Sequence, residues 1–425
     1  MLDIKLLRES PALIEADLKR RGETEKLNWV SEAAEMDKKY RRGLQEAEAL
    51  RQKRNAITDE INKLMAQKKD FKSKIAEAKG LPDKIKGIEQ ETAPLKEQID
   101  WFLMRFPNIL HDSVPAGKDD SENVVVREVG RKASNAKMLP HGELLEKNGW
   151  ADFARAAKTS GQGFYFLKGD FALLEMSLVR FAVDRLAEKG YTAIQPPLMM
   201  NRPAYEGVTD LADFENVMYK VDSEDLYLIA TSEHPMAAMY RDEIFGEKDL
   251  PVKLAGVSPC FRREIGKHGI DTRGIFRVHQ FNKVEQFVFC LPEDTWKFHE
   301  EILANAEGLF KDLGLAYRVV NICTGDIGTV AAKKYDIEAW MPREEKYREV
   351  VSCSNCTTYQ AVRSNIKCRK KDGSKEYVHT LNSTMVATSR ALRAIAETYC
   401  DGETLEIPKV LRPYMNGKKE IKAGK

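Results

Sequence analysis

The sequence predicts an α+β fold, in which a long antiparallel pair of helices precedes a domain built on an antiparallel sheet. Apolar residues recur at intervals of three, four and seven between about residues 28 and 106, which is the spacing of a two-helix seam. Prolines, a glycine and an acidic run then interrupt this rhythm, and beyond them short β-rich runs alternate with occasional helices. A length of 425 residues also favours more than one domain.

Composition limits the classes of protein to which the chain can belong. Its net charge is +2 although 32% of its residues are charged, so anion binding requires local clusters of basic side chains. No run approaches the roughly 18 apolar residues of a membrane helix, and residues 1–22 lack the apolar region of a signal peptide. Seven cysteines, an odd number, favour reduced thiols. We therefore expect a cytoplasmic protein without membrane segments or disulfides.

Residues 28–106 are expected to form an antiparallel helical hairpin, the arm. Its seam residues are Val30, Ala33, Tyr40, Leu44, Ala47, Ile57, Ile61 and Leu64, followed by Ile85, Ile88, Leu95, Ile99 and Phe102. The turn lies either near residues 67–72 or at Gly80-Leu81-Pro82, and Pro94 should kink the second helix or end it locally. Helices of about 37 residues would extend roughly 55 Å.

Two functions suit such an arm. A long apolar seam commonly serves a dimerising coiled coil. Lysines concentrate toward the tip, however, and self-association does not need them: they are Lys63, Lys68, Lys69, Lys72, Lys74 and Lys79. We therefore expect the arm to bind an elongated polyanion through neutralisation of its phosphates.

The remainder of the chain reads as a junction, residues 111–165, and a second domain, residues 166–425. Residues 170–189 carry a broad apolar helical face, which Gly190 would cap, and a short strand is expected in "YTAIQPP" after it. The polar tail "NGKKEIKAGK" is expected to be disordered.

Residues 261–289, "FRREIGKHGIDTRGIFRVHQFNKVEQFVF", are the strongest candidate for a functional site. Glycines mark a loop between a short strand that ends near Glu264 and a longer strand that begins near Ile275. Strand alternation then gives one face an unusual set of side chains: Arg277, His279, Phe281, Lys283 and Glu285.

That face suits a small ligand better than a solvated surface. Phe281 and Glu285 would lie about 13 Å apart, which fits a ligand with a stackable base at one end and an ammonium group at the other. A surface hairpin is the alternative, but nearby arginines favour phosphate binding. Neither a Walker-type phosphate loop nor a Rossmann glycine motif occurs, so a nucleotide would need another kind of site.

These motifs resemble those of the class II aminoacyl-tRNA synthetases, and in particular the seryl-tRNA synthetase family. "FRRE", a glycine-rich loop and "DTRGIFRVHQFNKVEQF" look like motif 2, residues 170–197 resemble motif 1, and "NSTMVATSRALRAIAETY" with "IPKVLRPYM" resembles motif 3. "TSE" at 231–233 looks like the T-x-E that binds the amino acid, and "YREVVSCSNCTTYQ" is similar to the metal and ATP strand. The arm and "VPAG" match the tRNA-binding arm and its junction, so the resemblance covers nearly the whole chain.

The resemblance implies the fold, the reaction and the partners. It implies a tRNA-binding domain over residues 1–110 and a class II catalytic domain over 166–425, the latter an antiparallel sheet flanked by helices. It implies activation of L-serine with ATP and transfer of serine to the 3′ end of tRNA(Ser). Whether tRNA(Sec) is also a substrate stays open. Motif 1 implies a homodimer, with Pro196-Pro197 at the interface.

The same resemblance implies roles for individual residues. The catalytic residues would be Arg262, Glu264 and Arg390. The ATP contacts would be Arg262, Arg263, Glu264, Arg273, Val278, Phe281, Glu349, Val350, Val351, Ser352 and Arg390. The serine contacts would be Thr231, Ser232, Glu233, Arg262, Glu285, Asn382 and Thr384. Glu349 and Ser352 resemble the pair that contacts Mg²⁺, the lysines of the arm tip would contact tRNA, and the loop "GKHGIDTRG" would reach the acceptor end.

Two positions depart from the family pattern, and one motif offers a competing site. Thr384 stands where serine is frequent, and Val362 stands where arginine is common, which leaves Arg363 as the expected basic contributor. Cys353 and Cys356 in "CSNC", together with the downstream Cys368 and His379, would suit tetrahedral zinc. The string also reads as a buried strand and occurs in family members without zinc, so zinc is not expected.

Two further functions are compatible with a chain of this kind. A ligase that loads an amino acid onto a carrier protein would have a missing or rebuilt arm, and this chain keeps a long one. A silent RNA-binding adaptor would have lost Arg262, Glu264, Glu349 or Arg390, all of which are present.

Overall fold

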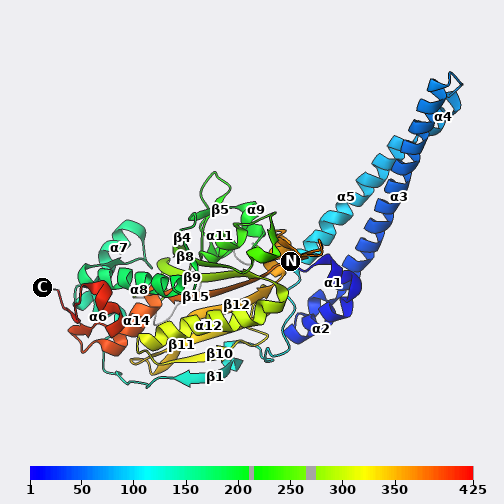
Figure 1. Cartoon of the computed structure of the whole chain (residues 1–425). Helices are drawn as coiled ribbons and strands as arrows, with labels where there is room; N and C mark the ends of the chain where they lie inside the picture. Colours follow the sequence, from blue (N-terminus) through cyan, green and yellow to red (C-terminus); the bar gives the residue numbers. More distant parts are fainter. Residues whose placement is uncertain (210–214, 265–273, 425) are drawn as a thin grey trace. The chain divides into compact units, whose positions relative to one another are not determined.

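The computed structural model describes residues 1–209, 215–264 and 274–424 and divides the chain into two compact units, Met1–Pro107 and Asn108–Lys425 (Figure 1). The first unit is entirely helical. Its helices are α1 (Ile4–Glu9), α2 (Pro11–Arg21), α3 (Leu27–Ala66), α4 (Lys72–Ala78) and α5 (Leu81–Arg105).

Helices α3 and α5 form the predicted antiparallel arm. The Trp29 and Trp101 rings lie 5.3 Å apart at its base, and Arg51 pairs with Glu89 at 2.5 Å further along. The buried seam includes residues that the repeat predicted: Val30, Ala33, Ala47 and Ile57 on α3, and Ile85, Ile99 and Phe102 on α5. Leu44, also predicted, is 42% exposed because a two-helix seam is too narrow to cover every apolar position.

The helices of the arm are interrupted at both positions where the sequence predicted a turn. Helix α3 ends at Ala66, and α4 already runs back along α3, because Lys74 on α4 pairs with Glu60 on α3 at 2.8 Å. The chain therefore reverses within residues 67–71, and Gly80 interrupts the returning helix. Of the two expectations for Pro94, that it ends the second helix is wrong, since α5 continues through it to Arg105.

The second unit is built on an eight-stranded sheet with the order β1-β10-β11-β12-β15-β9-β8-β4. Neighbours are antiparallel except for β4 and β8, which confirms the predicted antiparallel sheet. The strands are β1 (Val124–Val129), β4 (Thr192–Ile194), β8 (Val252–Phe261), β9 (Gln280–Cys290), β10 (Tyr317–Asn321), β11 (Lys333–Met341), β12 (Lys346–Thr357) and β15 (His379–Ala387).

Three long helices cover one face of this sheet: α8 (Gly169–Ala187), α12 (Thr295–Asp312) and α14 (Thr388–Tyr399). Figure 1 shows α12 lying across the strands, and Gln286 on β9 donates to the Ile302 carbonyl of α12 at 3.0 Å. The main core lies between these helices and the sheet and includes Phe171, Leu174, Leu178, Val284, Val288, Leu309, Leu381 and Ile395. The predicted helix over 170–189 is thus confirmed as α8.

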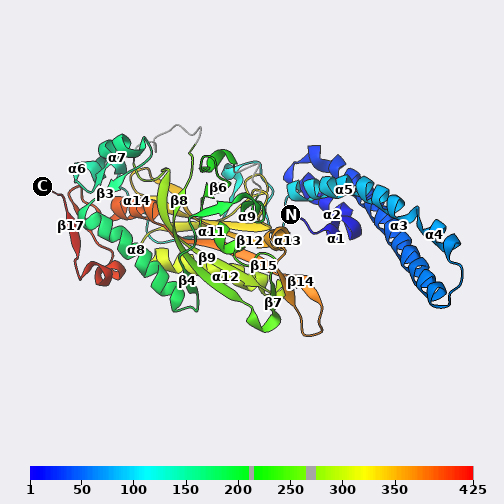
Figure 2. The same cartoon turned by 90° about the horizontal axis from the view of Figure 1, so that it is seen from above.

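Shorter helices lie on the opposite face: α9 (Arg202–Glu206), α11 (Glu233–Ala238) and α13 (Tyr359–Arg363). They enclose a second, smaller core with the other side of β9, to which Phe287 and Phe289 contribute. Small sheets complete the unit (Figure 2). Their strands are β2 (Ala151–Asp152) with β3 (Phe166–Leu167), β5 (Met199–Asn201) with β6 (Leu226–Leu228), β7 (Ile244–Gly246) with β13 (Lys367–Arg369) and β14 (Lys375–Tyr377), and β16 (Thr404–Glu406) with β17 (Glu420–Lys422).

Two segments differ from the sequence expectation. The stretch 111–165, read as a junction, lies within the second unit and supplies edge strand β1 and helices α6 (His141–Lys147) and α7 (Phe153–Ser160). The expectation of a disordered tail is wrong, because residues 420–422 form β17, which pairs with β16, and Ile421 is buried. No helix in the described part of the chain is long and apolar enough to cross a membrane.

The strands of residues 261–289 begin and end differently from the prediction. Strand β8 ends at Phe261, and β9 begins at Gln280 rather than near Ile275. The backbone before Gln280 bonds outside the sheet, since the Ile275 N–H donates to the His141 ring and the His279 N–H donates to the Gly163 carbonyl. Arg277 and His279 therefore leave the predicted strand face, whereas Phe281, Lys283 and Glu285 share it.

Candidate active site

A pocket of about 570 Å³ opens on the sheet face opposite α12. Strands β9, β12 and β15 form its floor, and the residues that follow β8, together with the start of α11, form one wall. Residues that the sequence separates by more than a hundred positions line it together, among them Thr231, Arg262, Glu285, Glu349, Asn382 and Arg390.

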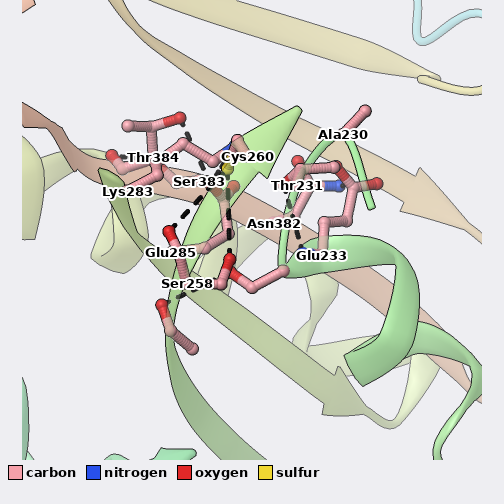
Figure 3. A network of polar contacts seen from close by, with 12 residues as sticks. Ala230, Thr231, Glu233, Ser258, Cys260, Lys283, Glu285, Asn382, Ser383 and Thr384 are labelled. Atoms are coloured by element: carbon pink, nitrogen blue, oxygen red, sulfur yellow. Dashed lines mark hydrogen bonds and ion pairs between the residues drawn. The ribbon is translucent and has the colours of Figure 1, made fainter. Parts of the chain in front are cut away.

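One end of the pocket is enclosed and holds a buried ion pair (Figure 3). Glu285 on β9 is 1% exposed, and its Oε2 lies 2.5 Å from the Nζ of Lys283. Thr384, opposite Glu285 on β15, donates its hydroxyl to the same carboxylate oxygen at 3.3 Å. The strand period aligns Lys283 with Glu285, and the register of β15 adds Thr384.

A second carboxylate, that of the partly buried Glu233, lies at the same end. It is the first residue of α11, and its Oε1 accepts from Gln360 at 3.0 Å and from Asn382 at 3.1 Å. The hydroxyl of Thr231 accepts the backbone N–H of Glu233 at 3.2 Å, which fixes the start of the helix. Gln360 in turn accepts from Thr380 at 2.7 Å, so this end is held by amides and hydroxyls.

Burial makes both carboxylates costly to ionise. Burial, together with the neighbouring charge of Glu285, raises the pKa of Glu233 to about 7. Burial also raises the pKa of Glu285, although the Lys283 ammonium pulls it down. A cationic group that entered this end would stabilise both ionised carboxylates, so the site favours an ammonium ligand.

The other end of the pocket is more open and carries arginines beside an aromatic ring. The Arg262 guanidinium lies 5.4 Å from the centre of the Phe281 ring, and its Nε donates to the Ala230 carbonyl at 3.3 Å. Arg263 and Glu264 also line the pocket here, and Glu264 lies 3.9 Å from Arg277. A planar base and a phosphate group match these side chains.

Strand β12 and helix α14 also contribute side chains to the more open end. Glu349, Val350 and Ser352 on β12 line the pocket. The Nη1 of Arg390 lies 3.0 Å from the Glu349 carboxylate and 3.0 Å from its backbone carbonyl. Partial removal from water raises the pKa of Glu349, but the positive charges of Arg390 and Lys334 outweigh this effect. The pKa of Glu349 therefore lies below its ordinary value. This carboxylate is therefore ionised near neutral pH.

Some predicted contacts lie away from the pocket. The Ser232 hydroxyl donates to the Gly256 carbonyl at 3.3 Å, and the side chains of Val278 and Val351 are buried outside the lining. Arg363 donates to the backbone carbonyls of Glu206 and Thr209, so it supports a neighbouring loop rather than the pocket. The predicted ATP contact Arg273 and most of the loop "GKHGIDTRG" lie outside the described residues.

Two residues that contact the proposed serine-binding carboxylates received no role from the sequence: Lys283, which pairs with Glu285, and Gln360, which donates to Glu233. Lys283 had a usable signal, because strand alternation already put it on the face of Phe281 and Glu285. Gln360 had none, since its position depends on how α13 meets β15, where Thr380 donates to it.

The cysteines of "CSNC" separate in the structure. Cys353 packs in the main core beneath α12, whereas Cys356 lines the pocket and accepts from Asn382 at 3.5 Å. Cys368 lies in the smaller core on β13. Among the described residues, no group of three or more His, Cys, Asp or Glu side chains could hold a metal ion.

Comparisons with known proteins agree on one family. Residues 1–110 match the seryl-tRNA synthetase N-terminal domain, and residues 219–399 match the tRNA synthetase class II core domain of the G, H, P, S and T enzymes. The chain is 62% identical over 422 residues to the serine–tRNA ligase of Methanocorpusculum labreanum, a match that covers 98% of this chain and 99% of that protein. It is 61% identical over 425 residues to the serine–tRNA ligase of Methanoculleus marisnigri, covering 99% and 100%.

Solved structures extend this agreement to three dimensions. Seryl-tRNA synthetase from Pyrococcus horikoshii, complexed with ATP, matches with a TM-score of 0.93 and 50% identity over 100% of both chains. Cytoplasmic serine–tRNA ligase from Naegleria fowleri, in complex with AMP, matches with a TM-score of 0.88 and 36% identity, covering 100% of this chain and 99% of that one. Matches to both domains and identities over the full length lead to one conclusion: the chain belongs to the seryl-tRNA synthetase family of class II aminoacyl-tRNA synthetases.

Proposed function

We propose that this chain activates L-serine with ATP to form seryl-adenylate and then transfers serine to the 3′ end of tRNA(Ser). The observation that carries the proposal is the division of one pocket into two chemically different ends. Buried carboxylates with amide and hydroxyl neighbours suit the ammonium and hydroxyl of serine. Arginines beside an aromatic ring and a carboxylate suit a nucleoside triphosphate.

The residues divide the work of activation. Glu233 and Glu285 hold the serine ammonium, and Asn382 and Thr384 line the hydroxyl side. Phe281 stacks on the adenine, Arg262 binds the α-phosphate, and Arg390 binds the outer phosphates. A serine carboxylate oxygen attacks the α-phosphorus, a new P–O bond forms, and the bond to pyrophosphate breaks with its electron pair on the leaving group. The protein contributes alignment and positive charge and needs no covalent nucleophile.

The second step uses the same alignment. The terminal ribose hydroxyl of tRNA attacks the carbonyl carbon of seryl-adenylate, and AMP leaves. Removing the serine hydroxyl would leave buried polar groups without partners, so alanine should be rejected strongly. Threonine carries an extra methyl group, and its rejection must be steric.

Mg²⁺ is the metal that the chemistry calls for. It prefers oxygen ligands and keeps waters and phosphate oxygens in its shell. Glu349 and Ser352 offer a carboxylate and a hydroxyl on β12, on either side of a shift in its register with β11, and both line the pocket. This donor set fits the ion, which would neutralise charge on the phosphates.

The arm supplies the proposed tRNA contact. Lys63, Lys68, Lys69, Lys72 and Lys79 are exposed around its tip, as phosphate neutralisation requires. Lys74 differs, because it pairs with Glu60 at 2.8 Å and Glu77 at 3.4 Å. We further propose a homodimer through the α8 region, as motif 1 implies, and a cytoplasmic location consistent with seven buried free cysteines.

Serine-dependent exchange of pyrophosphate into ATP, followed by charging of total tRNA, tests this function. The expected result is exchange with serine but not alanine, and charging of a tRNA fraction that accepts serine. Absence of exchange with serine would refute the proposal. Exchange without tRNA charging would favour an amino acid:carrier-protein ligase, and RNA binding without exchange would favour a silent adaptor.

A further inference from the structure

The pocket contains a buried lysine, Lys283, for which the reaction as described has no use. It is 6% exposed, and within the described residues Glu285 is the single carboxylate with which it forms an ion pair. Its ammonium therefore already neutralises the carboxylate with which an amino-acid ammonium would pair. A ligand with an ammonium group must displace Lys283 or share its partner.

Displacement by an ammonium alone would be costly. It would leave a buried lysine without a counter-charge, and breaking a buried ion pair in this way is strongly unfavourable. A ligand that carries a carboxylate beside its ammonium avoids this cost, because the carboxylate can pair with the released lysine. The ion pair thus favours a zwitterion over a simple amine or a simple acid.

The position of Lys283 on β9 suits this exchange. It stands between Phe281, the proposed adenine platform, and Glu285, at about 6.6 Å along the strand from each. The carboxylate of serine and the α-phosphate of ATP must meet between those two groups. Its cross-strand neighbours, Ser258 on β8 and Ala387 on β15, have small side chains.

We propose that Lys283 exchanges partners during substrate binding: it breaks its ion pair with Glu285 and pairs with the substrate carboxylate instead. This exchange makes the pocket selective for zwitterionic ligands. This inference rests on the proposed function. Lys283 stays protonated throughout: it holds the carboxylate while one of its oxygens attacks phosphorus, and it then faces the phosphate of the adenylate. No proton or electron is transferred to or from the lysine.

Pyrophosphate exchange by the full chain tests the exchange of partners. L-serinamide, which keeps the ammonium but lacks the carboxylate, serves as a competitive inhibitor, and the ratio of its Ki to the KM of serine reports the contribution of the carboxylate. In the wild-type protein this ratio should exceed roughly 100. In Lys283→Met it should fall about 10-fold or more, because serine binds more weakly while serinamide does not, and kcat should fall as well. Lys283→Arg should retain most of the ratio.

Lys334→Met is the matched control, because Lys334 also lines the pocket but lies 4.0 Å from a different carboxylate, Asp336. It should leave the ratio unchanged. An unchanged ratio in Lys283→Met, or an equal fall in Lys334→Met, would overturn the proposal. A wild-type ratio near 1 would overturn it even if Lys283→Met failed to fold. A wild-type protein that activates another amino acid instead of serine would refute the proposed function, and Lys283 would then be tested with that amino acid and its amide.

Discussion

The arm tip and the pocket both depend on lysine, but in opposite surroundings. Lys68 and Lys72 at the tip are exposed to solvent, whereas Lys283 in the pocket is buried against Glu285. Exposed charges are screened by salt and contribute weakly and nearly independently. Buried charges must be matched one to one, since an unpaired partner costs several kcal/mol. The arm should therefore tolerate single changes that the pocket does not.

Removing the arm should produce the largest effect and sharpen the division of labour. Deletion of residues 31–100, with a short glycine linker, should abolish tRNA charging and spare serine-dependent pyrophosphate exchange. The Trp29 and Trp101 rings lie 5.3 Å apart, so the new junction joins neighbouring points of the helical base. Charging and exchange assays on the same preparation measure both activities. A folded deletion variant that has lost exchange would count against two separable units.

Glu285→Ala should have the next largest effect. The substitution removes the proposed partner of the serine ammonium and leaves Lys283 unpaired. The binding free energy of serine should weaken by about 3 kcal/mol or more. The KM for serine should rise at least roughly 100-fold, while the KM for ATP should change less than about threefold. Glu285→Gln, which can still accept from Thr384, should show a smaller rise. Equal rises for serine and ATP would refute the assignment of Glu285 to the ammonium.

The predicted fold and the observed fold agree where a local pattern dictates the structure. The seam of α3 and α5 and the apolar face of α8 follow from residue spacing, which long-range contacts only reinforce. The errors occur where a distant contact decides. Strand β9 begins late because Ile275 and His279 bond to His141 and Gly163, more than a hundred residues earlier. Such partners leave no signal in the segment itself.

The site divides in the same way. Alternation along one strand correctly grouped Phe281, Lys283 and Glu285, because that relation is local. The same reasoning could not show that the Ser232 side chain points away from the pocket. Its orientation depends on where β8 passes the start of α11, because its hydroxyl donates to the Gly256 carbonyl of β8. The family resemblance assigned residues to ligands but gave no account of Lys283, whose importance appears only from its distance to Glu285.

The pH dependence of stability should expose the cost of the buried carboxylates. The pKa of Glu233 is raised from 4.5 to about 7, so between those pH values the folded state keeps a proton that the unfolded chain has released. The folded state then binds more protons, and the contribution of Glu233 to the free energy of unfolding falls as pH rises through this range. Above pH 7 the contribution is constant.

Glu233→Gln isolates that contribution, because glutamine does not titrate. The free energy of unfolding of the wild-type protein minus that of the variant should fall by about 1 to 3 kcal/mol between pH 4.5 and 7.5. Chemical denaturation at several pH values measures it. Glu143→Gln, at an exposed position on α6, is the control and should give a change below about 0.5 kcal/mol. A difference that rises with pH would contradict the raised pKa.

Neutralising the arm tip should have the smallest effect per residue. Replacing Lys68, Lys69, Lys72 and Lys79 together by glutamine should raise the KM for tRNA about 10-fold at low salt, with each single change contributing about twofold. The dependence of log KM on log salt should become shallower, since tRNA binding releases fewer counterions when phosphate contacts are lost. Lys74→Gln is the matched control, because Glu60 and Glu77 already neutralise this lysine and its replacement should leave the salt slope unchanged. If one tip lysine accounted for the whole effect, the arm would bind through a specific contact like those of the pocket, and the contrast between the two regions would fail.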